Sequence, residues 1–251
     1  AQAGRMEFTN QVSLQSEYEP ATKHFLLIGF LAMLCGAVVF AVYCFKKKEK
    51  MHQENMVFLA AAVSCLLYYL MWSGLGVMHK EDTEGNQRLV FTARYIDRFI
   101  TGPLLLFSLA SLCNADLAEI VQLIGVDLFM VASSGIGASV LHPWKWIWWT
   151  IGITFFILLA IQVFALVTKE KDGKIGSQLN ILALLLLISW AVYDIVWVLG
   201  EEGLQAISIS LEVGFVVLAD IVSKIAYGLY LIFATLPQEE EGEGAEGTTM
   251  V

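Results

Sequence analysis

The residue of this chain best suited to chemistry is Lys224, which lies inside the long apolar run 204–236. A lysine at membrane depth is costly unless another group changes its environment or its chemistry. Asp220 lies four residues earlier, on the same face of a helix. The pair is open to two interpretations. It is a structural ion pair, or Lys224 holds a carbonyl ligand covalently as a Schiff base, for which a desolvated amine is suited.

Other ionisable residues also lie within apolar runs. Arg94, Asp97 and Arg98 lie in one run with Thr101, and Asp97 and Thr101 are four residues apart, on one helix face. Ionisable groups at membrane depth face the interior of a bundle and mark proton relays, ion paths or ligand counter-ions. A set of unrelated ion pairs would explain neither their number nor their spacing. The aspartates of the other runs are Asp127, Asp194 and Asp220.

Aromatic residues accompany these charges. Trp190, Tyr193 and Trp197 follow the spacing i, i+3, i+7, so they form one stripe on a helix. Such a stripe is usually plain core, but here it shares its face with Asp194 and would meet the Lys224 side of a bundle. A flat, apolar ligand that ends in a carbonyl would suit such a chamber.

The elements that must position these residues are seven apolar segments of spanning length. The chain is 57% hydrophobic and only 16% charged, as in a multi-pass membrane protein. We therefore predict an all-α bundle of seven transmembrane helices, with short loops that make sequence neighbours spatial neighbours. The predicted segments are 24–45, 55–78, 90–112, 117–141, 146–168, 177–199 and 204–236.

The charges of the loops predict the orientation of the bundle. Lysines follow the first and fifth segments, whereas the opposite side carries few basic residues among several acidic ones. Because cytoplasmic loops are rich in lysine and arginine, the N-terminus is expected outside and the C-terminus in the cytoplasm. The protein is expected in the cell membrane. We expect residues 1–21 to be extracellular, 22–236 to form the membrane domain and 237–251 to be an acidic, disordered tail.

Several classes of site find no support in the sequence. The four cysteines, Cys35, Cys44, Cys65 and Cys113, lie in or beside apolar runs without the spacing of a metal site, so we interpret them as small buried hydrophobic residues. Phosphate-binding glycine motifs and nucleic-acid modules are absent from the sequence. We therefore expect neither an enzyme, nor a metal protein, nor a partner of nucleic acid.

The motifs above resemble those of the microbial (type 1) rhodopsins over roughly residues 22–236. They are Arg94-Tyr95-x-Asp97 with Thr101 and Pro103, Trp190-x-x-Tyr193 with Trp197, and Asp220-x-x-x-Lys224. The resemblance implies all-trans retinal, bound to Lys224 as a protonated Schiff base. It also implies the lipid bilayer and protons as partners, and we expect a homo-oligomer in the membrane.

The same resemblance implies roles for individual residues. Asp97 looks like the primary counter-ion and proton acceptor, Asp220 like the second counter-ion, and Arg94 like the arginine of the extracellular side. Tyr69 and Tyr193 look like the tyrosines that donate hydrogen bonds to Asp220. Glu202 and Glu212 match the two glutamates of the proton-release group. Residues that match the retinal pocket are Trp190, Trp197, Met130 and Trp149.

The chain departs from the family pattern at three positions. Ser108 stands where strong proton pumps carry a carboxylic proton donor, and serine cannot supply a proton near neutral pH. Arg98 stands where a tryptophan packs against retinal, and Asp194 stands where helix six usually has a proline. Because unpaired buried charges are costly, we expect Arg98 and Asp194 to neutralise each other at the pocket wall. The alternative is that Arg98 turns away to water or to another carboxylate.

These features favour a light-driven outward proton pump whose photocycle is slow because Ser108 replaces the donor. A sensory photoreceptor is the main alternative, because slow cycles suit signalling and the pattern of Asp97, Thr101 and Ser108 also occurs in a sensory member of the family. A light-gated channel is disfavoured by the retained acceptor. A retinal carrier or degenerate opsin is a fourth hypothesis, because the pocket is unusual.

Overall fold

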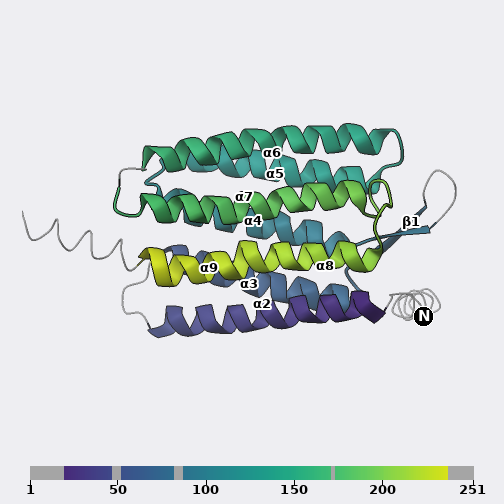
Figure 1. Cartoon of the computed structure of the whole chain (residues 1–251), viewed down its shortest axis with the longest axis horizontal. Coiled ribbons are helices and arrows are strands. Elements are labelled where there is room, and N and C mark those ends of the chain that lie inside the picture. The colour runs from purple at the N-terminus through teal and green to yellow at the C-terminus, as the bar shows by residue number, and fades with distance from the viewer. Residues whose placement is uncertain (1–19, 47–51, 82–86, 171–172, 237–251) are drawn as a thin grey trace, which may run out of the picture.

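The computed structural model describes residues 20–46, 52–81, 87–170 and 173–236. Seven helical segments are long and apolar enough to cross a membrane, which confirms the predicted all-α class (Figure 1). Nearly all of the predicted extracellular segment 1–21 and the predicted acidic tail 237–251 lie outside the described residues. The first six spanning helices are α2 (Pro20–Lys46), α3 (His52–Trp72), α4 (Thr92–Leu112), α5 (Leu117–Ser139), α6 (Trp144–Lys169) and α7 (Gly176–Leu199).

The seventh span is one continuous helix whose hydrogen-bonding pattern changes along its length. It begins as α8 (Ile209–Asp220), continues as the π-helical turn η1 (Ile221–Ala226) and ends as α9 (Tyr227–Tyr230) and a second π-helical turn, η2 (Leu231–Thr235). A π-helical turn inserts an extra residue into an α-helix and often marks a functional site. Lys224 lies in the first of these turns.

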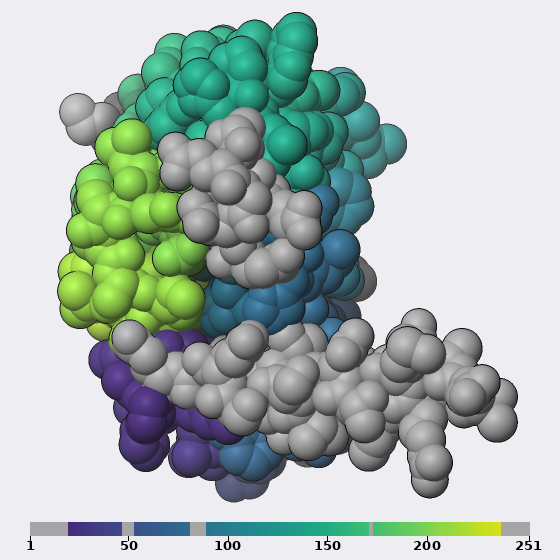
Figure 2. Space-filling view, turned by 90° about the vertical axis from the view of Figure 1, so that its right-hand side faces the viewer, coloured from purple at the N-terminus to yellow at the C-terminus, as the bar shows by residue number. Residues whose placement is uncertain are grey.

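The helices form a closed ring in sequence order. Each span packs against the next one along the chain, and α2 closes the ring by packing against α8, so the expectation that sequence neighbours are spatial neighbours is confirmed. In the view of Figure 2, α2 (purple) and the teal helices lie at opposite sides, with the green end of the chain along one flank. In this ring, α3, α4, α7 and the seventh span all face the same interior of the bundle.

The second predicted segment is too long, because the helix ends at Trp72 and not at residue 78. Gly74 has a φ of 81°, a left-handed conformation that glycine adopts without steric cost and that ends the helix. The chain then forms a two-stranded antiparallel hairpin from β1 (Met78–Glu81) and β2 (Gln87–Val90), with Met78 opposite Val90. Because β2 takes up residues to 90, the third span begins at Thr92.

The last span also begins later than predicted, at Ile209 and not at residue 204. Ser208 caps this helix, because its side chain accepts a hydrogen bond from the backbone N–H of Leu211 at 3.3 Å. At the start of α5, Asp116 and Glu119 form a reciprocal capping box. Such caps determine the first residue of a helix, which the apolar character of the sequence does not define.

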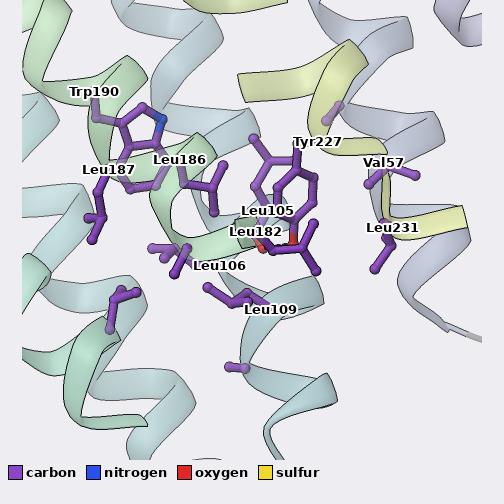
Figure 3. Close-up of a cluster of buried hydrophobic side chains, with 14 of the residues drawn as sticks. Val57, Leu105, Leu106, Leu109, Leu182, Leu186, Leu187, Trp190, Tyr227 and Leu231 are labelled. Atoms are coloured by element: carbon purple, nitrogen blue, oxygen red, sulfur yellow. Dashed lines mark hydrogen bonds between the residues drawn. The ribbon is translucent and has the colours of Figure 1, made fainter. Parts of the chain in front are cut away.

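A buried apolar cluster fills the half of the bundle around α9. Leu105, Leu106 and Leu109 of α4 meet Leu182 and Leu186 of α7 in this cluster (Figure 3). Tyr227 and Leu231 of the seventh span complete it. The charged residues Asp97, Lys224 and Glu212 are buried outside this cluster, and Glu54 is buried at the start of α3.

Candidate functional site

The centre of the bundle is an ion cluster around Lys224. Its side chain is 2% exposed, and Nζ makes ion pairs with Asp97 Oδ2 from α4 and with Asp220 Oδ1, the latter at 2.5 Å. A lone buried ammonium would be very costly, whereas one that contacts two carboxylates is compensated. Lys224 and Asp220 thus lie together, as their spacing in the sequence indicates, and Asp97 contacts the same nitrogen.

Two tyrosines hold the second carboxylate of the cluster. The hydroxyl of Tyr68 donates to Asp220 Oδ2 at 2.6 Å, and the hydroxyl of Tyr193 donates to Asp220 Oδ1 at 2.5 Å. The expectation for Tyr193 agrees with this geometry, but the expectation for Tyr69 is corrected. The side chain of Tyr69 is 45% exposed and packs against Phe30 and Trp72, because adjacent residues of a helix point about 100° apart.

Asp97 is held by a hydroxyl from another helix. Ser64 Oγ of α3 donates to Asp97 Oδ1 at 2.6 Å. Thr101 is buried on the same face of α4, as expected, but its hydroxyl donates to the backbone carbonyl of Asp97 at 2.8 Å and not to the carboxylate. Both oxygens of the Asp97 carboxylate thus have a partner, Ser64 on one and Lys224 on the other.

A second ion cluster lies towards the hairpin end of the bundle. Arg94 makes ion pairs with Glu202 and with Glu212, the latter at 2.5 Å, and Tyr95 donates to Glu202 at 3.2 Å. Glu212 also accepts a hydrogen bond from the backbone N–H of Glu201 at 2.8 Å. The arginine therefore joins the two glutamates that the sequence analysis grouped on this side.

A cavity connects the two clusters. It is small and partly open, and it is lined by residues of α4, α7, the loop after α7 and the seventh span. Its lining includes Asp220 of the first cluster and Arg94 and Glu202 of the second. Polar side chains around an internal space of this kind can carry water and protons.

The side chains predicted for the pocket lie on α5, α6 and α7. Trp190, Tyr193 and Trp197 are all buried on α7, and Met130 of α5 is fully buried. Trp197 meets Trp146 of α6 edge to face, with ring centroids 5.9 Å apart, and Trp146 meets Trp149 in the same way at 6.3 Å. Three neighbouring helices thus contribute large, mostly apolar side chains that could wall the chamber expected beside Lys224.

The expected ion pair between Arg98 and Asp194 is not formed. The Arg98 guanidinium lies over the ring of Tyr193, with its carbon 4.3 Å from the ring centroid, so a π face and not a carboxylate contacts the cation. One nitrogen of Arg98 and one oxygen of Asp194 are buried without a hydrogen-bond partner. The cation is still close enough to Asp127 and Asp194 to interact with both electrostatically.

Asp127 is a third charged residue close to Arg98. Both of its carboxylate oxygens are buried without a hydrogen-bond partner. Gly102 of α4 faces it so closely that a Cβ there would lie 2.5 Å from Asp127 Oδ2, which explains why a residue without a side chain fits at this position. Arg98 thus interacts electrostatically with Asp127 and Asp194 without a direct hydrogen bond to either. Three charged side chains in such an arrangement are unusual among otherwise apolar surroundings.

Comparison with known proteins identifies the family. The model of the family described as bacteriorhodopsin-like protein matches residues 20–238. The chain belongs to the microbial (type 1) rhodopsins. This family comprises retinal-binding, seven-helix, multi-pass integral membrane proteins.

Named relatives of this rhodopsin include light-driven pumps. Archaerhodopsin-1 of Halorubrum ezzemoulense is 30% identical over 215 residues, which cover 82% of this chain and 81% of the relative. The structure of the light-driven proton pump LR (Mac) from Leptosphaeria maculans is 26% identical with a TM-score of 0.81, covering 88% of this chain and 98% of that one. Halorhodopsin, a light-driven chloride pump, has a TM-score of 0.83 over 89% of this chain and 98% of its own, but at 19% identity it shows the fold alone.

The residues of this rhodopsin fit retinal at the amine end of the pocket. Lys224 offers a buried amine, Asp97 and Asp220 balance a positive charge at that atom, and Trp190 with Trp197 supplies flat apolar walls. Arg98 is the exception, because it brings a cation to a wall that would contact an apolar chain. The cation–π contact with Tyr193 draws that charge towards the ring.

Two residues of the central cluster, Ser64 and Tyr68, were not predicted from the sequence. Tyr68 and Ser64 lie four residues apart on α3, so both face the interior, and each donates to one of the two central carboxylates. The available signal was this spacing of two hydroxyl side chains in an otherwise apolar run. A choice between Tyr68 and Tyr69 needed the rotation of α3, which the run of apolar residues around them does not reveal.

Proposed function

We propose that this rhodopsin is a light-driven outward proton pump that binds all-trans retinal covalently at Lys224 Nζ. The observation that carries the proposal is the contact of this one buried nitrogen with both Asp97 and Asp220. When bound, retinal supplies light absorption and a change of shape that alters the surroundings of Nζ. The remaining steps belong to side chains of the protein.

In this proposal, Asp97 and Asp220 have different tasks. Asp97 Oδ2 contacts Lys224 Nζ and accepts its proton, because its other oxygen has only one neutral donor, Ser64. Asp220 accepts hydrogen bonds from Tyr68 and Tyr193, which stabilise its charge and make it the poorer proton acceptor. In this proposal Asp220 balances the positive charge of the cluster, and Asp97 takes the proton.

The outward step uses the second ion cluster. Arg94 and Glu202 line the same cavity as Asp220, and Arg94 also pairs with Glu212. A change of charge at Asp97 can therefore move Arg94 and so change the charge balance at the two glutamates. The proposal places this end of the bundle outside the cell, as the lysines after the first and fifth spans favour. A proton released from the glutamates then leaves the cell.

The test of the proposed function is a light-induced pH change. In a suspension of cells that carry the retinal-loaded protein, illumination should acidify the medium, and a protonophore should abolish the change. A sensory photoreceptor, the alternative that a serine at position 108 favours, would bleach and recover without sustained acidification. A passive light-gated channel would give a photocurrent that reverses with the ion gradient, so either result contradicts an outward pump.

We predict a slow photocycle because the inner half of the bundle offers no carboxylic donor at position 108. Ser108 is fully buried and lies 3.4 Å from the hydroxyl of Tyr227, and neither group gives up a proton readily near neutral pH. If Lys224 Nζ is reprotonated from bulk water, the rate of photocycle recovery should fall about tenfold per pH unit as the pH rises. Flash photolysis between about pH 6 and about pH 8 measures this slope.

Two substitutions control this prediction. Ser108→Asp should speed recovery and flatten its dependence on pH, whereas Ser108→Ala should leave both close to those of the unmodified protein. A recovery rate of the unmodified protein that does not change over this range would instead indicate an internal donor. Asp127, which is buried without a hydrogen-bond partner, would be the first residue to test.

A further inference from the structure

Ser64 uses its hydroxyl differently from several other buried or half-buried serines of the bundle. The hydroxyls of Ser111, Ser133, Ser134 and Ser189 each donate to the backbone carbonyl four residues earlier in their own helix. This is a common way to satisfy a serine hydroxyl inside a helix. Ser64 is 0% exposed, yet its hydroxyl reaches across from α3 to α4 and donates to Asp97 Oδ1 at 2.6 Å.

Thr101 does not fill this role, because its hydroxyl is engaged elsewhere. It lies one turn from Asp97 on α4 and donates to the Asp97 backbone carbonyl at 2.8 Å. The interactions of the Asp97 carboxylate within the described residues are therefore an ion pair with Lys224 and a neutral hydrogen bond from Ser64. Substituting Ser64 would remove the neutral one and leave the charged one in place.

The position of Ser64 on α3 makes this contact part of a pattern. Tyr68 follows one turn later and donates to Asp220 Oδ2 at 2.6 Å. One face of α3 thus provides one hydroxyl to each of the two carboxylates that contact Lys224. Because the donors come from a helix that carries neither carboxylate, the rotation of α3 controls both hydrogen bonds.

We propose that Ser64 is a positioning residue that keeps the Asp97 carboxylate ionised and oriented until light drives a proton onto it. The proposal rests on the proposed function, in which Asp97 is the acceptor. A hydroxyl donates more strongly to a carboxylate than to a carboxylic acid, so the Ser64 bond favours the charged form of Asp97. Loss of the bond should make Asp97 easier to protonate in the dark.

The other groups that face Asp97 do not change in a Ser64 variant. Lys224 and Asp220 approach from the seventh span, and Tyr68 approaches from α3. On α4 itself, Arg94 is engaged by two glutamates. A shift in the titration of Asp97 on substitution of Ser64 therefore reports the lost hydroxyl, provided that the pigment still forms.

The experiment is an acid titration of the visible absorption band of the purified, retinal-loaded protein. In Ser64→Ala, the midpoint of the acid-induced red shift should move to higher pH by about one unit, a roughly tenfold change in proton binding. Ser133→Ala is the matched control, because it also removes a buried hydroxyl, one that donates to the carbonyl of Phe129 in its own helix. Its midpoint should stay within about 0.3 units of the unmodified protein.

A second variant and a second measurement keep the test decisive. Ser64→Cys retains the approximate size but donates weakly, so its midpoint should lie between those of the unmodified protein and Ser64→Ala. This variant decides the question if Ser64→Ala does not form pigment. In the infrared, the C=O stretch of protonated Asp97 should rise in frequency in Ser64→Ala, because the acid has lost a hydrogen-bond partner.

The possible failures can be told apart. Equal midpoints for Ser64→Ala and Ser133→Ala, with an unchanged C=O stretch, would overturn the role of Ser64. If Asp97→Asn red-shifts the band in the same preparation, that result would leave the proposed function intact. If Asp97→Asn does not shift the band, the assignment of Asp97 as acceptor is itself wrong, and the role of Ser64 is overturned with it.

Discussion

Lys224→Ala is expected to yield a protein without colour. The amine of Lys224 is the buried nucleophile of the chamber, and both of its carboxylate partners are placed to balance a positive charge on Nζ. Without it, retinal has no covalent attachment at this site, and the visible absorption band should be lost completely. The measurement is the absorption spectrum of the purified variant after reconstitution with all-trans retinal and extensive washing.

Lys224→Arg separates the chemistry of the amine from its charge. Removing one member of a buried ion pair typically costs about 3–5 kcal/mol, so Lys224→Ala should also melt at a lower temperature. Arginine keeps a positive charge beside Asp97 and Asp220 but offers no amine for attachment. It should be colourless yet more stable than the alanine variant, and a visible band that survives washing in either variant would refute the assignment of Lys224.

Asp97→Asn is expected to red-shift the absorption band at neutral pH and to abolish pumping. The amide cannot balance the charge at Lys224 Nζ, so the ground state with a positive charge on that atom is stabilised less. The amide also cannot accept the proton. Because a positioned base contributes at least about a hundredfold to proton transfer, steady acidification in light should fall below detection.

Asp220→Asn is the matched comparison for this prediction. Asp220 also contacts Lys224 Nζ but is held by the hydroxyls of Tyr68 and Tyr193. Its variant should lose the balancing charge and keep the acceptor, so some light-driven proton transfer from Nζ should survive. An unchanged spectrum in Asp97→Asn, together with a large red shift in Asp220→Asn, would exchange the two roles.

The sequence alone determined the class of fold and the centre of the site. Seven runs of about twenty apolar residues have few alternatives to membrane-spanning helices, because every backbone polar group in a bilayer must be paired. Lys224 and Asp220 could be placed together because they are four residues apart on one helix. Local spacing on one helix is information that the sequence carries directly.

The ends of two spans were decided by local structure that apolar runs do not record. The second span ends at Trp72 because Gly74 turns the chain into a hairpin, and the last begins at Ile209 behind the cap of Ser208. A hydropathy average over many residues does not detect the effect of a single glycine or serine. The consequence is small for the site, because both ends lie outside the central cluster.

Contacts between helices were decided only by the tertiary structure. Tyr68 and Tyr69 are adjacent and of the same type, and only the rotation of α3 directs Tyr68 to Asp220 and Tyr69 outwards. The same rotation brings Ser64 to Asp97, a contact without any signal near Asp97 in the sequence. Arg98 and Asp194 were expected to pair because both are charged and interior, yet the Arg98 guanidinium lies over the ring of Tyr193. A helix can turn about its axis without changing its sequence pattern, so the choice among interior partners is made by the packing of the whole bundle.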